Sequence, residues 1–217
     1  MIGSNNIEIE VYREDTYRVK QCNFEREPIH FVDIGANVGW FSKLVDDNFE
    51  NCNIYSYELD STNFNNFQKN LNNPKNNILA QHAAVIGFNE FKKYWKHSHN
   101  IGGHKPIFLG SSSYISEETI DPRMLAEMKT RGSFIDIDIN KLTLWDIIEN
   151  NKIDFIDFLK LDCEGSEYEI LKHVIEKDYC KRVLNLAAEM HGRDYPGYIE
   201  LINIIKKKFD FVEIHKN

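Results

Sequence analysis

The stretch "HFVDIGANVGWF", residues 30–41, decides the fold of this chain. A run of β-forming residues reaches Asp33, passes Gly35 and Gly39, and continues with the apolar spacing of a helix. Gly35 permits backbone angles that other residues avoid, and Gly39 allows close packing. In open α/β sheets, ligands bind beside such a first turn. The stretch therefore predicts a ligand site, although a strand–helix connection that needs glycine for geometry alone is the alternative.

Strand and helix patterns alternate along most of the chain. Apolar runs predict strands at 7–12, 29–35, 53–59, 77–87, 154–162, 182–191 and 209–214. Apolar residues at helical spacing follow most of these runs. Such an order predicts right-handed crossovers and a parallel sheet. We expect an α/β protein, a three-layer sandwich that forms one domain over residues 1–217.

Residues 88–140 interrupt this order with a predicted β-rich, irregular insert. Short strands are expected at 91–98, 110–115 and 133–139, separated by polar loops. A helix at 142–150 then restores the alternation. Because the insert is long for a loop, we expect it to shape the pocket for a substrate.

The composition excludes several classes of function. Hydrophobic residues make up 42% of the 217 residues, as in globular proteins. Acidic residues outnumber basic ones by 34 to 26, which gives a formal charge of −8. Nucleic-acid affinity rests largely on lysine and arginine, so we expect no nucleic-acid partner.

No stretch predicts a membrane span or a signal peptide, so we expect a cytoplasmic protein that does not bind membranes. The four cysteines lie far apart without a C-x-x-C motif and are expected to be reduced thiols. The histidines of "HSHNIGGH", residues 97–104, match no structural zinc pattern. The sequence thus predicts no metal site.

Glu58 favours the ligand interpretation of the first turn. It ends the predicted second strand, 25 positions after Asp33. Nucleotide-binding sheets place an acid there because a carboxylate can accept both ribose hydroxyls. An adenosine-containing ligand follows, although a solvated strand-end glutamate is the simpler alternative.

The loop favours an adenosine ligand without phosphates. A dinucleotide fingerprint has glycine at the middle position, where this chain has Asn37, and a third glycine is missing. S-adenosylmethionine fits such a loop better than NAD(P). An NAD(P)-dependent oxidoreductase and a non-catalytic Rossmann-like binding module are the two alternatives.

The chain resembles the FkbM family of S-adenosylmethionine-dependent methyltransferases. The resemblance lies in "FVDIGANVGWFS", "YSYELDSTNFNNFQKNL" and "LTLWDIIENNKIDFIDFLKLDCEGSEYEIL", and "NLAAEMH" is similar to the family's next strand. Together these segments cover roughly residues 29–192. The resemblance implies a Rossmann-like methyltransferase fold with a mainly parallel central sheet.

The resemblance also implies a cofactor site. It places Asp33, Gly35, Asn37 and Gly39 around the methionine part of S-adenosylmethionine, and Glu58 on its ribose. Residues expected nearby are Leu59, where the family often has proline, and, from the architecture alone, Ala83 and Ala84 for the adenine.

The catalytic candidates are acids and a histidine at strand ends. Asp162 follows the fourth strand of the core and is the first candidate for a general base, with cofactor binding as its other possible role. Glu164 is the second candidate, although it could merely assist the start of the next helix. Glu189 and His191 end the following strand and are expected at the same rim, where a polar pair finishing a strand is an equal alternative.

The family typically methylates hydroxyl oxygens, so we expect O-methylation of a small hydroxylated acceptor, with a sugar or glycan as first choice. The family's sheet commonly ends in a two-stranded hairpin, yet only 209–214 follows the last helix here. The missing strand is either absent or replaced by 7–12. The oligomeric state stays open, with a homodimer through the sheet edge as one arrangement.

Overall fold

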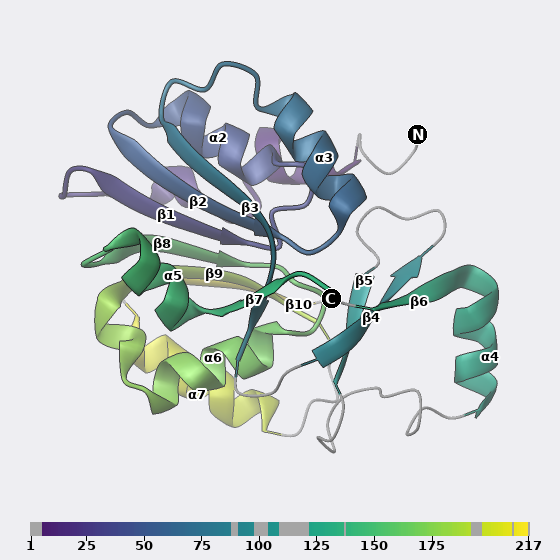
Figure 1. Cartoon of the computed structure of the whole chain (residues 1–217). Coiled ribbons are helices and arrows are strands. Elements are labelled where there is room, and N and C mark those ends of the chain that lie inside the picture. Colours follow the sequence, from purple (N-terminus) through teal and green to yellow (C-terminus); the bar gives the residue numbers. More distant parts are fainter. Residues whose placement is uncertain are drawn as a thin grey trace.

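The main sheet has seven strands in the order β10-β9-β8-β1-β2-β3-β7, and every neighbouring pair is parallel (Figure 1). The computed structural model describes residues 6–87, 91–97, 104–108, 122–136, 138–191, 197–209 and 211–216. The strands are β1 (Ile29–Ile34), β2 (Cys52–Glu58), β3 (Asn77–Ile86), β7 (Asn140–Thr143), β8 (Ile156–Leu161), β9 (Val183–Met190) and β10 (Phe211–Lys216). The expected α/β class and mainly parallel sheet are confirmed.

Helices cover both faces of this sheet and complete the three layers. On one face lie α2 (Trp40–Asn48) and α3 (Ser61–Asn70), and on the other α5 (Leu144–Asn151), α6 (Glu167–Glu176) and α7 (Tyr198–Lys208). Alternate residues of β1 pack against the two helical layers. Phe31 packs with the α2 layer, whereas Val32 and Ile34 pack with the α5–α7 layer. A strand covered on both faces reads as a continuous apolar run, as 29–34 does.

The insert forms a second, antiparallel sheet of β4 (Phe91–His97), β5 (His104–Phe108) and β6 (Gly132–Asp136) in the order β5-β4-β6. Helix α4 (Pro122–Arg131) precedes β6 and lies at its side in Figure 1. The predicted strand 110–115 lies outside the described residues. β6 ends at Asp136, short of the predicted 133–139.

The expected strand at 7–12 is wrong, because this segment forms a π-helical turn, Glu8–Arg13. Its alternating pattern also places Ile7 and Val11 four residues apart, on one side of a helix. Both line the pocket described below, whereas Ile9 between them is 40% exposed. A 3-10 helix, Val19–Gln21, follows. The segment therefore does not replace the missing sheet strand.

One edge of the sheet differs from expectation, and the other edge bears on an alternative that the sequence left open. β7, which the sequence did not predict, pairs with β3 immediately before α5, and the Thr143–Asp146 capping box marks where the helix starts. At the opposite edge, β10 pairs directly with β9 in parallel register. Within the described residues, no antiparallel strand lies between them.

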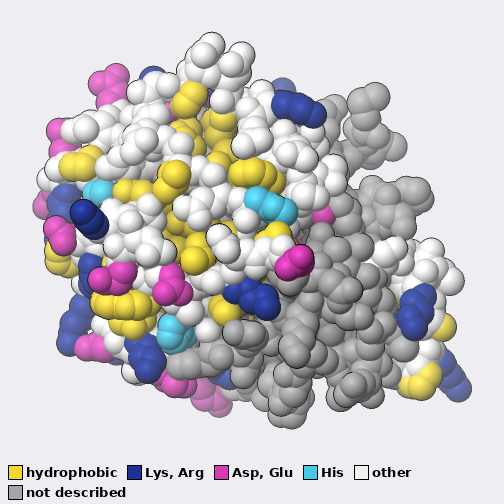
Figure 2. All heavy atoms as spheres, viewed as in Figure 1, with side chains coloured by type: hydrophobic (Ala, Val, Ile, Leu, Met, Phe, Trp, Pro, Cys, Tyr) yellow, Lys and Arg dark blue, Asp and Glu magenta, His cyan; other side chains and the backbone are white. Residues whose placement is uncertain are grey.

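The described surface carries basic and acidic side chains side by side. Figure 2 shows Lys and Arg side chains interspersed with acidic and uncharged ones over the described part of this face. No helix in the described ranges is both long enough and apolar enough to traverse a bilayer.

The turn after β1 is tightly packed against the loop after β8. Gly35 has φ +76°, and a Cβ there would lie 1.7 Å from the carbonyl oxygen of Asp162. Backbone nitrogens of Gly35 and Ala36 both donate to the carbonyl of Tyr57 at 3.0 Å, while Asp162 N donates to Ile34 O at 3.0 Å. The glycine is therefore required by close approach as well as by backbone angle.

Beneath this turn lies a buried ion pair. Lys160 Nζ donates a hydrogen bond to Gly35 O at 2.7 Å. The same nitrogen lies 3.1 Å from Asp33 Oδ1, and this contact is an ion pair without hydrogen-bond geometry. Asp33 Oδ2 accepts from Ser42 Oγ of α2 at 2.8 Å. Burial favours the neutral amine, but the charges of Asp33 and Asp162 outweigh it and raise the pKa of Lys160.

Replacing Gly35 by alanine tests the close approach. Gly35→Ala should lower the free energy of unfolding by more than about 3 kcal/mol, because Cβ would overlap backbone. The matched control is Gly197→Ala at φ +80°, where the nearest atom is 4.0 Å away. It should lose only about 1–2 kcal/mol from backbone strain. Urea unfolding measures both, and equal losses would contradict the packing argument.

Replacing Lys160 by methionine tests the buried pair. Lys160→Met should destabilise the fold by about 3–5 kcal/mol, because it leaves Asp33 charged and unpaired. The double variant with Asp33→Asn should lose at least about 1 kcal/mol less than the sum of the single losses. Lys43→Met, which breaks the exposed pair with Asp47, should change stability by about 0.5 kcal/mol or less. Additive losses at 33 and 160 would rule out the coupling.

Candidate active site

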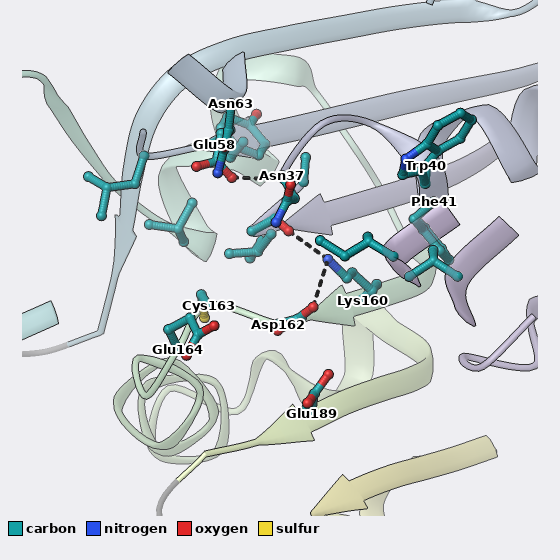
Figure 3. Close-up of a pocket in the computed structure, with 18 of the residues that line it drawn as sticks. Asn37, Trp40, Phe41, Glu58, Asn63, Lys160, Asp162, Cys163, Glu164 and Glu189 are labelled. Atoms are coloured by element: carbon teal, nitrogen blue, oxygen red, sulfur yellow. Dashed lines mark hydrogen bonds and ion pairs between the residues drawn. The ribbon is translucent and has the colours of Figure 1, made fainter. Parts of the chain in front are cut away.

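A pocket of about 360 Å³ opens at the carboxyl ends of β1, β2, β8 and β9 (Figure 3). Ligand pockets for drug-sized molecules begin at roughly 300 Å³. It lies where the strand order reverses, between β1 and β8. Parallel sheets bind ligands at that point because neighbouring loops diverge there. The residues from the strand ends include Gly35, Glu58, Asp162 and Glu189.

Glu58 and Asn37 form one end of the pocket. Glu58 Oε2 accepts from the backbone nitrogen of Asn37 at 2.8 Å, and Oε1 accepts from Asp60 N at 2.7 Å. Burial raises the pKa of Glu58 to about 7, although these two hydrogen bonds and Lys160 oppose the shift. A carboxylate oxygen can accept two hydrogen bonds. Glu58 therefore retains acceptor capacity for hydroxyl groups.

Small and apolar residues form the walls beside Glu58. Leu59, Ala83 and Ala84, which the sequence places near the cofactor, all line the pocket, and the adenine contact of the two alanines stays a prediction. Asn63 of α3 also lines it, and Figure 3 shows its side chain near Glu58. Small side chains beside one amide leave room for a planar heterocycle. Sequence patterns did not indicate Asn63, because it lies on a helix without a recognisable motif.

Two predicted cofactor residues, Asp33 and Gly39, are not among the residues that line the pocket. Asp33 is fully buried below the turn, where it holds Lys160 and Ser42. Gly39 precedes α2 at φ +91°, and a Cβ there would lie 2.8 Å from the ring of Phe67. In this structure both residues support the turn, so any contact with a ligand remains a prediction.

Asn37 lies just before α2 and hydrogen-bonds to the backbone there. It has φ +53°, which asparagine tolerates better than most residues, and its Oδ1 accepts from Val38 N at 2.8 Å. The backbone N–H of Val38 is therefore already hydrogen-bonded and does not face a ligand phosphate, as free N–H groups at a helix start can.

Asp162 stands between Lys160 and a residue that the sequence analysis missed, Tyr17. The hydroxyl of Tyr17 donates to Asp162 Oδ2 at 2.7 Å, and Lys160 Nζ lies 3.9 Å from the same oxygen. Burial and the charge of Asp162 raise the pKa of Tyr17 well above its ordinary value, so it remains a donor. Lys160 belongs to the run KLDCEGSE, residues 160–167, within the last long segment quoted for the resemblance, whereas no pattern marks Tyr17.

The N-terminal segment covers one side of the pocket. Ile7, Glu10 and Val11 of the π-helical region line it together with Thr16 and Tyr17. This segment also packs against α2, through contacts such as that between the rings of Tyr17 and Phe41, 5.7 Å apart. Because the segment contributes lining residues, it forms part of the binding site.

The loop after β8 brings the other predicted catalytic residues together. Glu164 has φ +57° and lines the pocket with Asp162, Glu189 and His191. Glu167 begins α6, and its two oxygens accept from Cys163 N and Gly165 N at 2.7 and 2.8 Å. Glu167 therefore fixes the start of α6 and the loop that precedes it.

His191 lies among carboxylates. Its Nδ1 is 3.1 Å from Glu167 Oε1, and its Nε2 is 3.7 Å from Glu164 and 3.9 Å from Asp162. Although burial favours neutral imidazole, the hydrogen bond to Glu167 and the charges of Glu167, Glu164 and Asp162 raise the pKa of His191 to about 10. In this arrangement, His191 must lose a proton before it can act as a base.

The residues present fit a cationic adenosine ligand. The Gly35 turn presents backbone where a side chain could not lie, and Glu58 can receive ribose hydroxyls. Five acids line the cavity: Glu10, Glu58, Asp162, Glu164 and Glu189. Carboxylates attract positive charge, whereas phosphates would be repelled. The donor set therefore suits S-adenosylmethionine better than a dinucleotide.

Comparison with known proteins agrees with this geometry. The methyltransferase FkbM domain matches residues 33–213. Methyltransferase sdnD of Sordaria araneosa is 23% identical over 197 residues, which cover 83% of this chain and 72% of that protein. No solved structure shows a significant match. The domain match confirms the family resemblance: the chain belongs to the family of FkbM-domain methyltransferases.

Proposed function

We propose that this protein is an S-adenosylmethionine-dependent O-methyltransferase that acts on a small hydroxylated acceptor, with a sugar or glycan as the preferred class. The observation that supports this most is one pocket with Glu58 at one end and Asp162 at the other, joined by the Gly35 turn. Family membership supplies the reaction class.

The two ends of the pocket have separate tasks. When bound, S-adenosylmethionine supplies a methyl group activated by a positively charged sulfur. Glu58 accepts the ribose hydroxyls, while Leu59, Ala83 and Ala84 contact the adenine. The turn at Gly35 faces the amino-acid part. These contacts fix the ligand, and orientation of this kind is worth up to roughly 7–11 kcal/mol in model systems.

Asp162 and the acids beside it bind the acceptor and remove its proton. A sugar hydroxyl is a poor nucleophile, so a base that removes its proton during attack helps by about 10²–10⁴-fold. Asp162 is held by Tyr17 on Oδ2, which fixes the carboxylate and leaves Oδ1 toward His191. Glu164 and Glu189 offer further acceptors for hydroxyl groups, as a polyol requires. The β-rich insert is assigned to the acceptor side.

The function is tested by cofactor binding and turnover. The wild-type protein should bind S-adenosylhomocysteine in calorimetry and should not bind NAD. Asp162→Asn should keep that affinity but slow methyl transfer to sugars by roughly 10²-fold or more, as mass spectrometry would record. Glu213→Gln, on β10, is the control and should behave like wild type. NAD binding without S-adenosylhomocysteine binding would favour an oxidoreductase, and cofactor binding without any turnover would favour a non-catalytic module.

Glu58 gives the binding a defined pH dependence. Its pKa of about 7 in the ligand-free protein means that acid converts the acceptor carboxylate into a neutral acid with fewer acceptor sites. Affinity for S-adenosylhomocysteine should therefore rise as the pH increases through about 7, by roughly tenfold. Glu58→Gln should bind more weakly at alkaline pH and lose most of this dependence. Calorimetry across the range measures it, and an unchanged profile in Glu58→Gln would rule out the ribose assignment.

A further inference from the structure

The ends of β8 and β9 bring together three side chains with metal-binding atoms. One ligand atom each from Asp162, Glu189 and His191 lies within 4.8 Å of the others. Asp162 Oδ2 is used by Tyr17, and Oδ1 faces His191. All three residues line the pocket. The site combines two carboxylates with one imidazole, which is more than an acidic cluster.

His191 is oriented so that one nitrogen points into this group. Its side chain is nine-tenths buried, with 10% exposed, and Nδ1 is held by Glu167, whose side chain is fully buried. Backbone donors at Cys163 and Gly165 fix Glu167 in turn. Among the described residues, Nε2 has no hydrogen-bond partner. Metal-ligating histidines have this arrangement, with a carboxylate on the other ring nitrogen.

The spacing around Nε2 suits a shared ion. The nearest carboxylate oxygens lie at 3.6 Å on Glu189, 3.7 Å on Glu164 and 3.9 Å on Asp162, beyond hydrogen-bond distance. Octahedral ligands at about 2.1 Å from a metal are roughly 3 Å apart when adjacent and about 4 Å apart when opposite. The observed separations lie between these two values, so the carboxylates would move toward Nε2 by roughly 1 Å or less to become adjacent ligands of one ion.

We propose that Asp162, Glu189 and His191 bind a divalent cation that holds a hydroxyl oxygen of the acceptor. Carboxylates favour Mg²⁺ and Mn²⁺, and one imidazole adds affinity for first-row transition ions, so Mn²⁺ is the appropriate probe. The sequence predicted no metal site, because these residues are separated along the chain and match no short ligand motif.

Three protein ligands leave coordination positions open, as in catalytic metal sites. An acceptor with neighbouring oxygens, such as a vicinal diol, could occupy two of them. Coordination lowers the pKa of a bound hydroxyl, and Glu164 would then take its proton in place of Asp162, which is engaged as a ligand. This role deepens the proposed function and rests on it, whereas binding of the ion does not.

The test is Mn²⁺ binding to the full chain at mildly alkaline pH, followed by electron paramagnetic resonance. The wild type should bind about one ion, with electron spin-echo modulation from an imidazole nitrogen. His191→Gln should lose that modulation, and both His191→Gln and Glu189→Gln should weaken binding at least tenfold. His30→Gln is the matched control. His30 lies near the opposite, amino end of β1, and this variant should bind like wild type.

The outcomes separate the two proposals. Absence of Mn²⁺ binding in a folded protein that still binds S-adenosylhomocysteine would overturn the metal site and leave the methyltransferase assignment standing. Ion binding without S-adenosylhomocysteine binding would overturn the proposed function instead. Equal affinity of wild type, His191→Gln and Glu189→Gln would show that the ion binds elsewhere. Circular dichroism verifies folding, and the nitrogen modulation of the wild type tests the site without any variant.

Discussion

The buried ammonium of Lys160 is the interaction on which the site depends. It binds the carbonyl of Gly35 and the carboxylate of Asp33, and lies near Asp162, so one cation connects the loops after β1 and β8. An unpaired buried charge would be costly, and three oxygens of two neighbouring strands compensate it here. Because Asp33 also receives a hydrogen bond from Ser42, the same network anchors α2. The ligand turn is thus held by Lys160, which itself lines the pocket and lies beside Asp162.

Much of the fold could be predicted because strands of a doubly covered sheet have a distinctive pattern. The runs at 29–34 and 156–161 are buried on both faces, and only such strands are continuously apolar. The strand prediction for 7–12 was wrong because the alternation of apolar residues and glutamate fits two structures. It fits a half-buried strand as well as a helix with Ile7 and Val11 on one side. Its helical form depends on packing against α2 and on the pocket, which no local pattern contains.

The site was predictable to the extent that topology determines it. Carboxyl ends of parallel strands meet at one edge, so Glu58, Asp162 and Glu189 had to converge once β2, β8 and β9 were recognised. Side-chain partners could not be predicted in the same way. The hydrogen bond from Tyr17 to Asp162 joins residues 145 positions apart, and only the three-dimensional structure brings them together. Asp33 illustrates the reverse case, since its motif position was recognised but its carboxylate is directed into the core.

The acids of the pocket form two groups: Glu58 on one side, and the carboxylates around His191 on the other. Glu58 is buried beside Leu59, Ala83 and Ala84, where burial raises its pKa to about 7 and makes its acceptor capacity sensitive to protonation. Asp162, Glu164 and Glu189 surround His191, whose raised pKa keeps it a cation that offsets their mutual repulsion. A bound sulfonium would lie between these groups and be attracted by both. The hydrogen bond from Lys160 to the carbonyl of Gly35 fixes this ammonium beside Asp33 and Asp162, while His191 supplies positive charge among the acids at the carboxyl ends of β8 and β9.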